Sequence, residues 1–176
     1  MMLHSQEDGR FWNSFAKAGA GQRFCLILGT CFFCGLLPGA PGTYGSALAV
    51  LLAFLIWALP ILHRALLVAG ILVLAIAVSS VSASVLGKGD PSEIVIDEVA
   101  GYMVAVFALP KSFLALGLAF IFFRIFDILK PFPIRQADRN VRGGLGIVLD
   151  DVLAGVMTYI VVKLIFLKLF GLMYVR

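Results

Sequence analysis

Charged side chains are scarce in this sequence. Only 14% of its 176 residues are Asp, Glu, Lys or Arg, whereas 61% are hydrophobic and the mean hydropathy is +1.04. An average soluble domain is about 25% charged and about 45–50% apolar. A soluble domain of this length cannot bury such an excess of apolar side chains. The composition therefore predicts an integral membrane protein with a single domain.

Histidine and cysteine are also scarce, with two and three copies. Cys31 and Cys34 form a C-x-x-C pair, but no second pair follows, and His4 and His63 lie far from it. A zinc or redox site is therefore not expected, and the cysteines are interpreted as packing residues. No basic run with interleaved aromatic residues occurs, which excludes a nucleic-acid partner.

The first 22 residues lack the apolar core of a cleavable signal peptide. We expect them to form a cytoplasmic arm or an amphipathic surface helix, with Phe11, Trp12 and Phe15 touching the bilayer. Residues 23–176 are then the membrane domain.

Long apolar segments predict an all-α, polytopic membrane helix bundle, because a spanning helix needs about 20 mostly apolar residues. Residues 23–38 are too short to span and are interpreted as a re-entrant or interfacial segment. We therefore expect about four to five spanning helices, this segment and an N-terminal surface helix. The candidate spans are 46–62, 65–86, 94–109, 112–129 and 145–175.

The charges lie mainly on one side of this topology. With a cytoplasmic N-terminus, the Lys and Arg residues concentrate in the arm and in the loops 87–93 and 130–144, which satisfies the positive-inside rule. The acidic residues are all at cytoplasmic helix ends or loops. They are Glu7, Asp8, Asp90, Glu93, Asp97, Glu98, Asp127, Asp138, Asp150 and Asp151.

Two adjacent acid pairs, Asp97-Glu98 and Asp150-Asp151, stand near the membrane together with Asp127. Carboxylates at that depth are costly and usually mark function. Like charges packed together favour a bound cation, and Mg²⁺ prefers a few carboxylates with water and phosphate oxygens. The alternative is that the pairs are interfacial caps and partners of nearby Arg and Lys residues.

Asp90 and Glu93 have two interpretations. Asp90, Pro91 and Glu93 suit the N-cap, N1 and N3 positions of a helix, which explains them by capping alone. Asp90, Glu93 and Asp97 would also share one helix face, so the first two are further candidate metal ligands.

Arg124, Asp127 and Lys130 are spaced by three residues, so they share a stripe at the end of their helix. Arg124 and Lys130 could bind a phosphate group, or Arg124 could form an internal salt bridge with Asp127. Thr43 and Ser46, in the glycine-rich stretch before a helix, could belong to an anion site at its N-terminus or act as its N-cap.

Three phosphatase classes are excluded by missing motifs. No cysteine has an arginine six residues later, no D-x-D motif occurs, and neither histidine lies in a polar cluster. Attack by water with the help of a metal ion is the chemistry that remains.

The segments LPGAPGTYGS (37–46), GKGDPSEIVIDEVAGY (87–102), FRIFDILKPFPI (123–134) and DRNVRGGLGIVLDDVLAG (138–155) resemble, in order, the phosphatidylglycerophosphatase A family. The resemblance implies a Mg²⁺-dependent enzyme of the bacterial inner membrane, and the distribution of charges predicts that its site faces the cytoplasm. Its expected substrate is the phospholipid phosphatidylglycerophosphate, which it would hydrolyse to phosphatidylglycerol and phosphate. The first 22 residues fall outside the resemblance.

The resemblance supports a set of site acids and motif positions in this chain. Asn140 and Val148 depart from the family pattern, but neither removes an expected metal ligand. Arg124, Lys130 and Arg139 are candidates to neutralise the phosphate. The acids are Asp97, Glu98, Asp127, Asp150 and Asp151, and the motif positions are Thr43, Ser46, Lys130 and Arg139.

Two other functions remain open from the residues alone. An ion-coupled carrier would place acids along its helices toward both faces, often with repeated halves, and a noncatalytic membrane subunit would use the charges for assembly.

Overall fold

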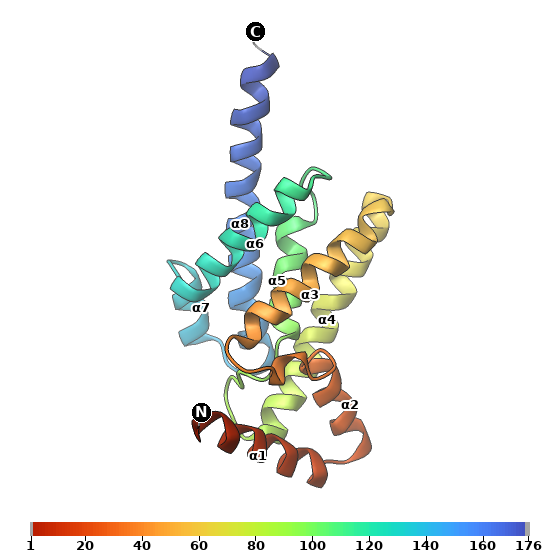
Figure 1. Ribbon diagram of the computed structural model, residues 1–176, viewed down its shortest axis with the longest axis vertical. Coiled ribbons are helices and arrows are strands. Elements are labelled where there is room, and N and C mark those ends of the chain that lie inside the picture. Colours follow the sequence, from red (N-terminus) through yellow and green to blue (C-terminus); the bar gives the residue numbers. More distant parts are fainter. Residues whose placement is uncertain (1, 175–176) are drawn as a thin grey trace.

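The computed structural model describes residues 2–174, and the side chains of residues 9–169. Within this range the regular secondary structure is helical and no strand occurs, which confirms the all-α class. Figure 1 shows the helices, and α8 is the longest of them. The elements are α1 (Met2–Lys17), α2 (Ala20–Gly29), η1 (Cys34–Leu36), α3 (Pro41–Leu55), η2 (Ile56–Ala58), α4 (Ile61–Leu86), α5 (Ile96–Val106), α6 (Phe113–Leu129), α7 (Ile134–Asn140) and α8 (Gly143–Tyr174).

Three helical stretches of the described chain are long and apolar enough to cross a membrane: Pro41–Ala58, Ile61–Leu86 and Gly143–Leu169. Large apolar side chains remain exposed on them, for example Val73, which is 70% exposed, and Leu167, which is 60% exposed. Such surfaces suit contact with lipid rather than with water. The three stretches therefore indicate a membrane protein.

The expected four to five spans and the re-entrant segment are not confirmed. α5 has 11 residues, too few for a complete span, and α6 has 17, the lower limit for one. Residues 23–38 form most of α2 and η1, joined by three residues with left-handed backbone, Cys31, Phe32 and Phe33.

Several predicted helix starts were wrong. Asp90 does not cap a helix, because α5 begins at Ile96 after an irregular loop. Asp90 and Glu93 therefore do not share a helical face with Asp97. Thr43 and Ser46 are not N-caps either, since α3 begins at Pro41, whose missing N–H is tolerated at a helix start.

Helix α5 is the centre of the molecule. It packs against α8, α3, α4 and α6, and all but two of its residues are buried. The buried Tyr102 donates a hydrogen bond to the Leu116 carbonyl at 2.8 Å and packs edge-to-face on Phe123 of α6. The acids at the N-terminus of α5 are consequently held inside the bundle.

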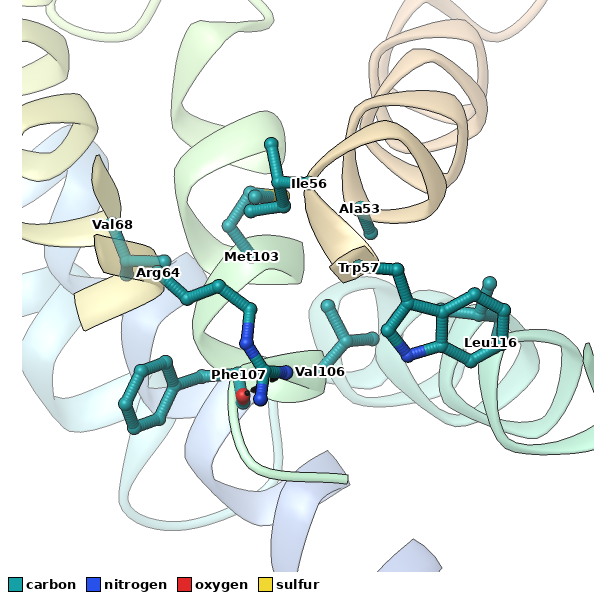
Figure 2. Close-up of a pocket in the computed structure, with 9 residues that line it drawn as sticks. All are labelled: Ala53, Ile56, Trp57, Arg64, Val68, Met103, Val106, Phe107 and Leu116. Atoms are coloured by element: carbon teal, nitrogen blue, oxygen red, sulfur yellow. Dashed lines mark hydrogen bonds between the residues drawn. The ribbon is translucent and has the colours of Figure 1, made fainter. Parts of the chain in front are cut away.

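The two ends of the bundle differ in character. In Figure 1 the lower end carries α1, α2, the loop 87–95 and the starts of α3, α5 and α8. The opposite end carries η2, the 107–112 turn and the last turns of α8. There Arg64 donates a hydrogen bond to the Phe107 carbonyl at 3.1 Å, beside Trp57 and Met103 (Figure 2).

The N-terminal helix α1 buries part of its apolar face against the bundle, whereas the sequence predicted that this face contacts the bilayer. Phe11 is completely buried, in a cluster with Ala18 and Leu26. The expectation that Phe11 contacts the bilayer was therefore wrong. Trp12 is 49% exposed. Helix α1 thereby contacts α2 and α4.

Candidate functional site

The first turn of α5 carries two adjacent acids inside the bundle, near one of its ends. Asp97 is 6% exposed, and Glu98 is only partly exposed. Their position at a helix N-terminus is electrostatically favourable, because the helix dipole is positive there. The dipole is a partial charge, so it offsets only part of the cost of burying two carboxylates.

Helix α8 adds a third acid through a close approach to α5. Asp151 is 3% exposed and its backbone lies directly against Gly101: a methyl group at Gly101 would be 2.5 Å from the Asp151 carbonyl oxygen. Gly155 likewise packs against the Gly101 carbonyl. Glycine at these two positions permits the backbone contact that brings Asp151 to the start of α5.

Asp97, Glu98 and Asp151 form a cluster in which one carboxylate oxygen from each lies within 4.8 Å of the others. Around an ion with oxygen ligands at about 2.1 Å, adjacent ligands are about 3 Å apart and opposite ones about 4.2 Å. Each of the three acids also has a buried oxygen without a hydrogen-bond partner in the described structure. Hard oxygen ligands without hydrogen-bond partners, gathered at one point, suit a divalent cation such as Mg²⁺.

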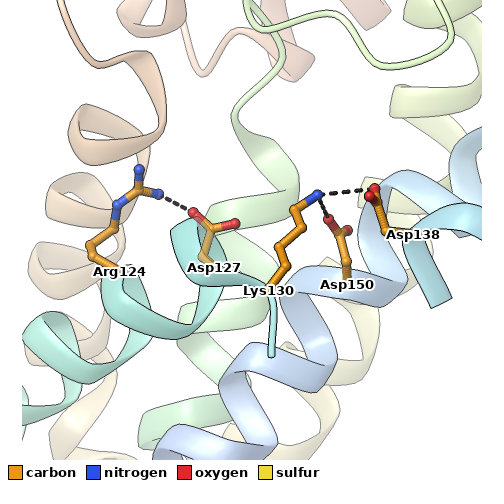
Figure 3. A network of polar contacts seen from close by, with 5 residues as sticks. All are labelled: Arg124, Asp127, Lys130, Asp138 and Asp150. Atoms are coloured by element: carbon orange, nitrogen blue, oxygen red, sulfur yellow. Dashed lines mark hydrogen bonds and ion pairs between the residues drawn. The ribbon is translucent and has the colours of Figure 1, made fainter. Parts of the chain in front are cut away.

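Asp127, on α6, lies beside this cluster and is held by an arginine. Arg124 donates a hydrogen bond to Oδ2 of Asp127 at 2.6 Å (Figure 3), so the internal salt bridge considered from the sequence is present. The carboxylate of Asp127 is also close enough to Glu98 and Asp151 to act on both electrostatically. The pair therefore brings the Arg124 guanidinium together with a fourth carboxylate to the edge of the acidic cluster.

Lys130 ends α6 and binds two acids from other helices. Its ammonium group lies 2.6 Å from Oδ2 of Asp150 and 3.0 Å from Oδ1 of Asp138 (Figure 3). Burial lowers the pKa of Lys130, but the hydrogen bonds to Asp150 and Asp138 outweigh this and raise the pKa above its ordinary value. Lys130 is therefore cationic at neutral pH. Asp150 faces this lysine, whereas its neighbour Asp151 faces the cluster.

The beginning of α3 forms another wall of the site. Gly42 lies against the Glu98 carboxylate and the Arg124 guanidinium, where a methyl group would collide with both. Thr43 is half-buried in the same turn, and the Ser46 hydroxyl donates a hydrogen bond to the Gly42 carbonyl at 2.7 Å. The first turn of α3 thus lies next to the acidic cluster, where its free backbone N–H groups could bind an anion.

Three other sequence candidates lie outside the three-acid cluster. Glu93 is buried and pairs with Lys88 at 2.7 Å. Asp90 is exposed and lines a cavity with Asp138 and Arg142. Arg139 is exposed on α7 and lines a separate cavity at the end of α6.

Sequence reasoning did not select Gly42, Gly101 or Asp138. A signal existed for the first two, since small residues in apolar helices mark close helix contacts. Asp138 gave no such signal, because its partner Lys130 becomes its neighbour only when α7 folds back beside α8.

Comparison with known proteins gives consistent results. The model of the phosphatidylglycerophosphatase A family matches residues 27–166. Phosphatidylglycerophosphatase A of Escherichia coli strain K12 is 39% identical over 139 residues, covering 75% of this chain and 77% of that protein. The protein of the same name from Haemophilus influenzae strain Rd is 36% identical over 138 residues, covering 77% of this chain and 85% of that protein.

A Bacteroides thetaiotaomicron protein with the provisional name phosphatidylinositol-3-phosphatase is 36% identical over 144 residues, covering 78% of this chain and 90% of that protein. No solved structure matches the chain.

Proposed function

Because this chain belongs to the phosphatidylglycerophosphatase A family, we propose that it hydrolyses phosphatidylglycerophosphate to phosphatidylglycerol and inorganic phosphate at its carboxylate cluster. The family that the four motifs indicated is the one that the comparisons identify, and the chain is accordingly a phosphatase. The specific substrate, the cofactor and the roles of individual residues are the proposal.

The observation that carries the proposal is the convergence of Asp97, Glu98 and Asp151 on one point. A cluster of carboxylates would repel a phosphate group, so a phosphatase with this site needs a cation between the two. Asp97, Glu98 and Asp151 are the proposed ligands of Mg²⁺, which would polarise the phosphoryl oxygens and acidify the attacking water. Their unpartnered buried oxygens support this assignment.

The side chains around the cluster have roles that follow from their positions. Arg124 and the first turn of α3 would hold the terminal phosphate. Gly42, in that turn, lies against both the Arg124 guanidinium and the Glu98 carboxylate, so these groups are next to the proposed metal ligands. Oδ1 of Asp127, the oxygen not bonded to Arg124, would accept the proton of the attacking water. The water oxygen bonds to phosphorus as the bond from phosphorus to the glycerol oxygen breaks. The leaving glycerol oxygen would take up the proton that Asp127 accepted, and inorganic phosphate is released.

The site would face the cytoplasm in a bacterial inner membrane. The loop 87–95, helix α7 with its connections and the N-terminal helices lie toward the same end of the bundle as the starts of α5 and α8, which carry the cluster (Figure 1). This end holds most of the Lys and Arg residues, so the positive-inside rule supports a cytoplasmic location for it. The acyl chains of the lipid would remain in the bilayer while the head group reaches the cluster.

A second substrate deserves a direct comparison. The Bacteroides relative carries the name of a phosphatidylinositol-3-phosphatase, and phosphatidylinositol 3-phosphate, like phosphatidylglycerophosphate, joins a phosphomonoester to a lipid through a phosphodiester. Phosphatidylglycerophosphate is preferred because two of the three relatives compared carry its name.

The test is release of phosphate by the purified chain in detergent, with each of these lipids, in Mg²⁺ or in excess EDTA. Asp97→Asn and Asp151→Asn should each lower kcat/KM at least about 100-fold, because removing one ligand weakens electrostatic stabilisation by several kcal/mol. Asp8→Asn, in α1, is the matched control and should retain activity. An unaffected rate in both ligand variants would refute the site.

A direct binding measurement separates the cofactor from catalysis. Mn²⁺ bound to the purified protein can be counted by electron paramagnetic resonance without substrate, and competition with Mg²⁺ gives the affinity. We expect Asp97→Asn and Asp151→Asn to lose this binding and Asp8→Asn to keep it. The same assays distinguish the rivals, since a carrier or a noncatalytic subunit would release no phosphate.

A further inference from the structure

A cavity opens at the junction of α6 and α7, next to the candidate site but outside its acidic cluster. It is lined by residues between Leu129 and Asn140. Its lining contains three basic side chains and two side-chain amides but no acid. The lining residues are Leu129, Lys130, Pro131, Phe132, Arg135, Gln136, Arg139 and Asn140.

Arg135 and Arg139 give this cavity uncompensated positive charge. They are four residues apart on α7, so they lie on one face of that helix. Both are exposed, and neither forms a salt bridge or a side-chain hydrogen bond within the described structure. Two unpaired guanidinium groups facing one cavity favour an anion with several oxygens, such as a phosphate.

The rim of the cavity is apolar. Phe132 is 79% exposed and Leu129 is 64% exposed, and both line the cavity beside its basic residues. Exposed apolar side chains next to arginines match the chemistry of a phospholipid, whose acyl chains adjoin its phosphate. A free inorganic phosphate would make no use of this rim.

Lys130 connects the cavity with the acidic cluster. It lines the cavity, yet its ammonium group binds Asp150 at 2.6 Å, and Asp150 is the neighbour of the proposed ligand Asp151. Figure 3 shows Lys130 between Asp127 and the acids of α7 and α8. A lipid phosphate in the cavity would therefore lie close to the cluster without entering it.

We propose that Arg135 and Arg139 form a second anion site, which binds the phosphodiester of an anionic phospholipid. The inference rests on the proposed function, because the proposed substrate carries a phosphodiester as well as the terminal phosphate that is removed. The diester could belong to the substrate itself or to another anionic lipid of the bilayer. In both cases the arginines position lipid and do not touch the reacting phosphorus.

The first experiment measures binding without catalysis. Short-chain phosphatidylglycerol, which has the diester but no terminal phosphate, is titrated into the purified full-length chain in neutral detergent with EDTA. Calorimetry should show binding by the wild type. Arg135→Gln and Arg139→Gln should each weaken it about tenfold, and the double variant further.

The matched control removes two positive charges from the same end of the molecule. Arg10→Gln/Lys17→Gln changes exposed residues of α1 and should leave the affinity within about twofold of the wild type. An equal loss in this control would mean that net charge alone attracts the lipid, which would overturn the proposal. Equal affinity of the wild type and the double variant would overturn it as well.

A kinetic experiment identifies the source of the diester. In neutral micelles with phosphatidylglycerophosphate as the only anionic lipid, Arg135→Gln/Arg139→Gln should raise KM at least tenfold with kcat within about twofold if the substrate's own diester binds. An unchanged KM, with loss of a response to added phosphatidylglycerol, assigns the site to a separate lipid. If the wild type released no phosphate, the proposed function would fail while the calorimetric result would stand.

Discussion

Lys130 supplies the positive charge that compensates the buried carboxylate of Asp150. It stands after the last residue of α6 with a left-handed backbone, and its ammonium group reaches both Asp150 and Asp138. Asp150 is 6% exposed, so without this partner it would be a buried carboxylate with no compensating charge. The lysine thus separates the roles of two neighbouring acids, since only Asp151 is left to face the cluster.

We predict that Lys130→Met lowers stability by about 1–2 kcal/mol, less than the cost for a fully buried pair, because Lys130 is about a quarter exposed. The measurement is the midpoint of thermal unfolding in detergent at neutral pH. Asp150→Asn should restore much of the loss when combined with Lys130→Met, since the unpaired charge is then removed. Additive losses in the double variant would contradict the pairing.

At the scale of elements, the packing of α5 on α8 determines the distance between the acids. Asp97 and Glu98 come from one helix and Asp151 from the other, and Gly101 and Gly155 lie where the two backbones meet. A larger side chain at that contact must push the helices apart. Helix packing and the geometry of the cluster are therefore coupled.

Gly101→Ala should consequently weaken Mn²⁺ binding by at least about tenfold and lower stability by about 1–3 kcal/mol, as overpacking does. Metal binding and the thermal midpoint are the two measurements. Gly117→Ala is the control, because no atom lies within 4 Å of a methyl group at that position of α6. It should be neutral or slightly stabilising, since alanine favours helix over glycine. Tight metal binding by Gly101→Ala would disprove the coupling.

At the scale of the whole molecule, the helices that can span the membrane surround a short central helix. Helix α5 is buried among α3, α4, α6 and α8 and starts at the end of the bundle that holds the basic loops. A buried half-length helix can place carboxylates within the bundle near one membrane surface, where a full span would carry its ends to both surfaces. With the proposed substrate, this arrangement would give the lipid head group access to the cluster from one side.

The orientation can be tested by cysteine labelling in bacterial cells. In a chain with Cys25, Cys31 and Cys34 replaced by serine, Ser92→Cys should react with a membrane-impermeant maleimide only after permeabilisation, because it lies in the 87–95 loop. Lys111→Cys, in the turn at the opposite end, should react in intact cells. Both positions are exposed. The reversed pattern would place the cluster outside the cytoplasm.

The sequence indicated which acids lie near one another, but not which of them join the cluster and which pair with a lysine. Asp97, Glu98 and Asp151 were selected because carboxylates near a bilayer are costly, and they do converge. Asp150 was grouped with them, although it faces Lys130. Adjacent helical residues point about 100° apart, so the sequence alone could not say which acid of the pair faces inward.

Some local signals were outweighed by packing. Asp90, Pro91 and Glu93 satisfy the preferences of a helix start, yet the helix begins at Ile96. Capping contributes only about 1 kcal/mol, whereas burial of the loop that precedes α5 involves several apolar residues, among them Ile94 and Val95. A local preference of that size does not decide where a buried helix begins.

By itself the sequence determined that this protein is a helical membrane protein of a lipid phosphatase family with a one-sided set of acids. These properties follow from composition, periodic apolar runs and short motifs, all of which are local in the chain. Only the tertiary structure decided which carboxylates share a point, which acid Lys130 neutralises, and that two arginines of α7 remain unpaired beside the site. Each of these depends on distances between helices far apart in sequence, which are set by the packing of glycine and apolar side chains.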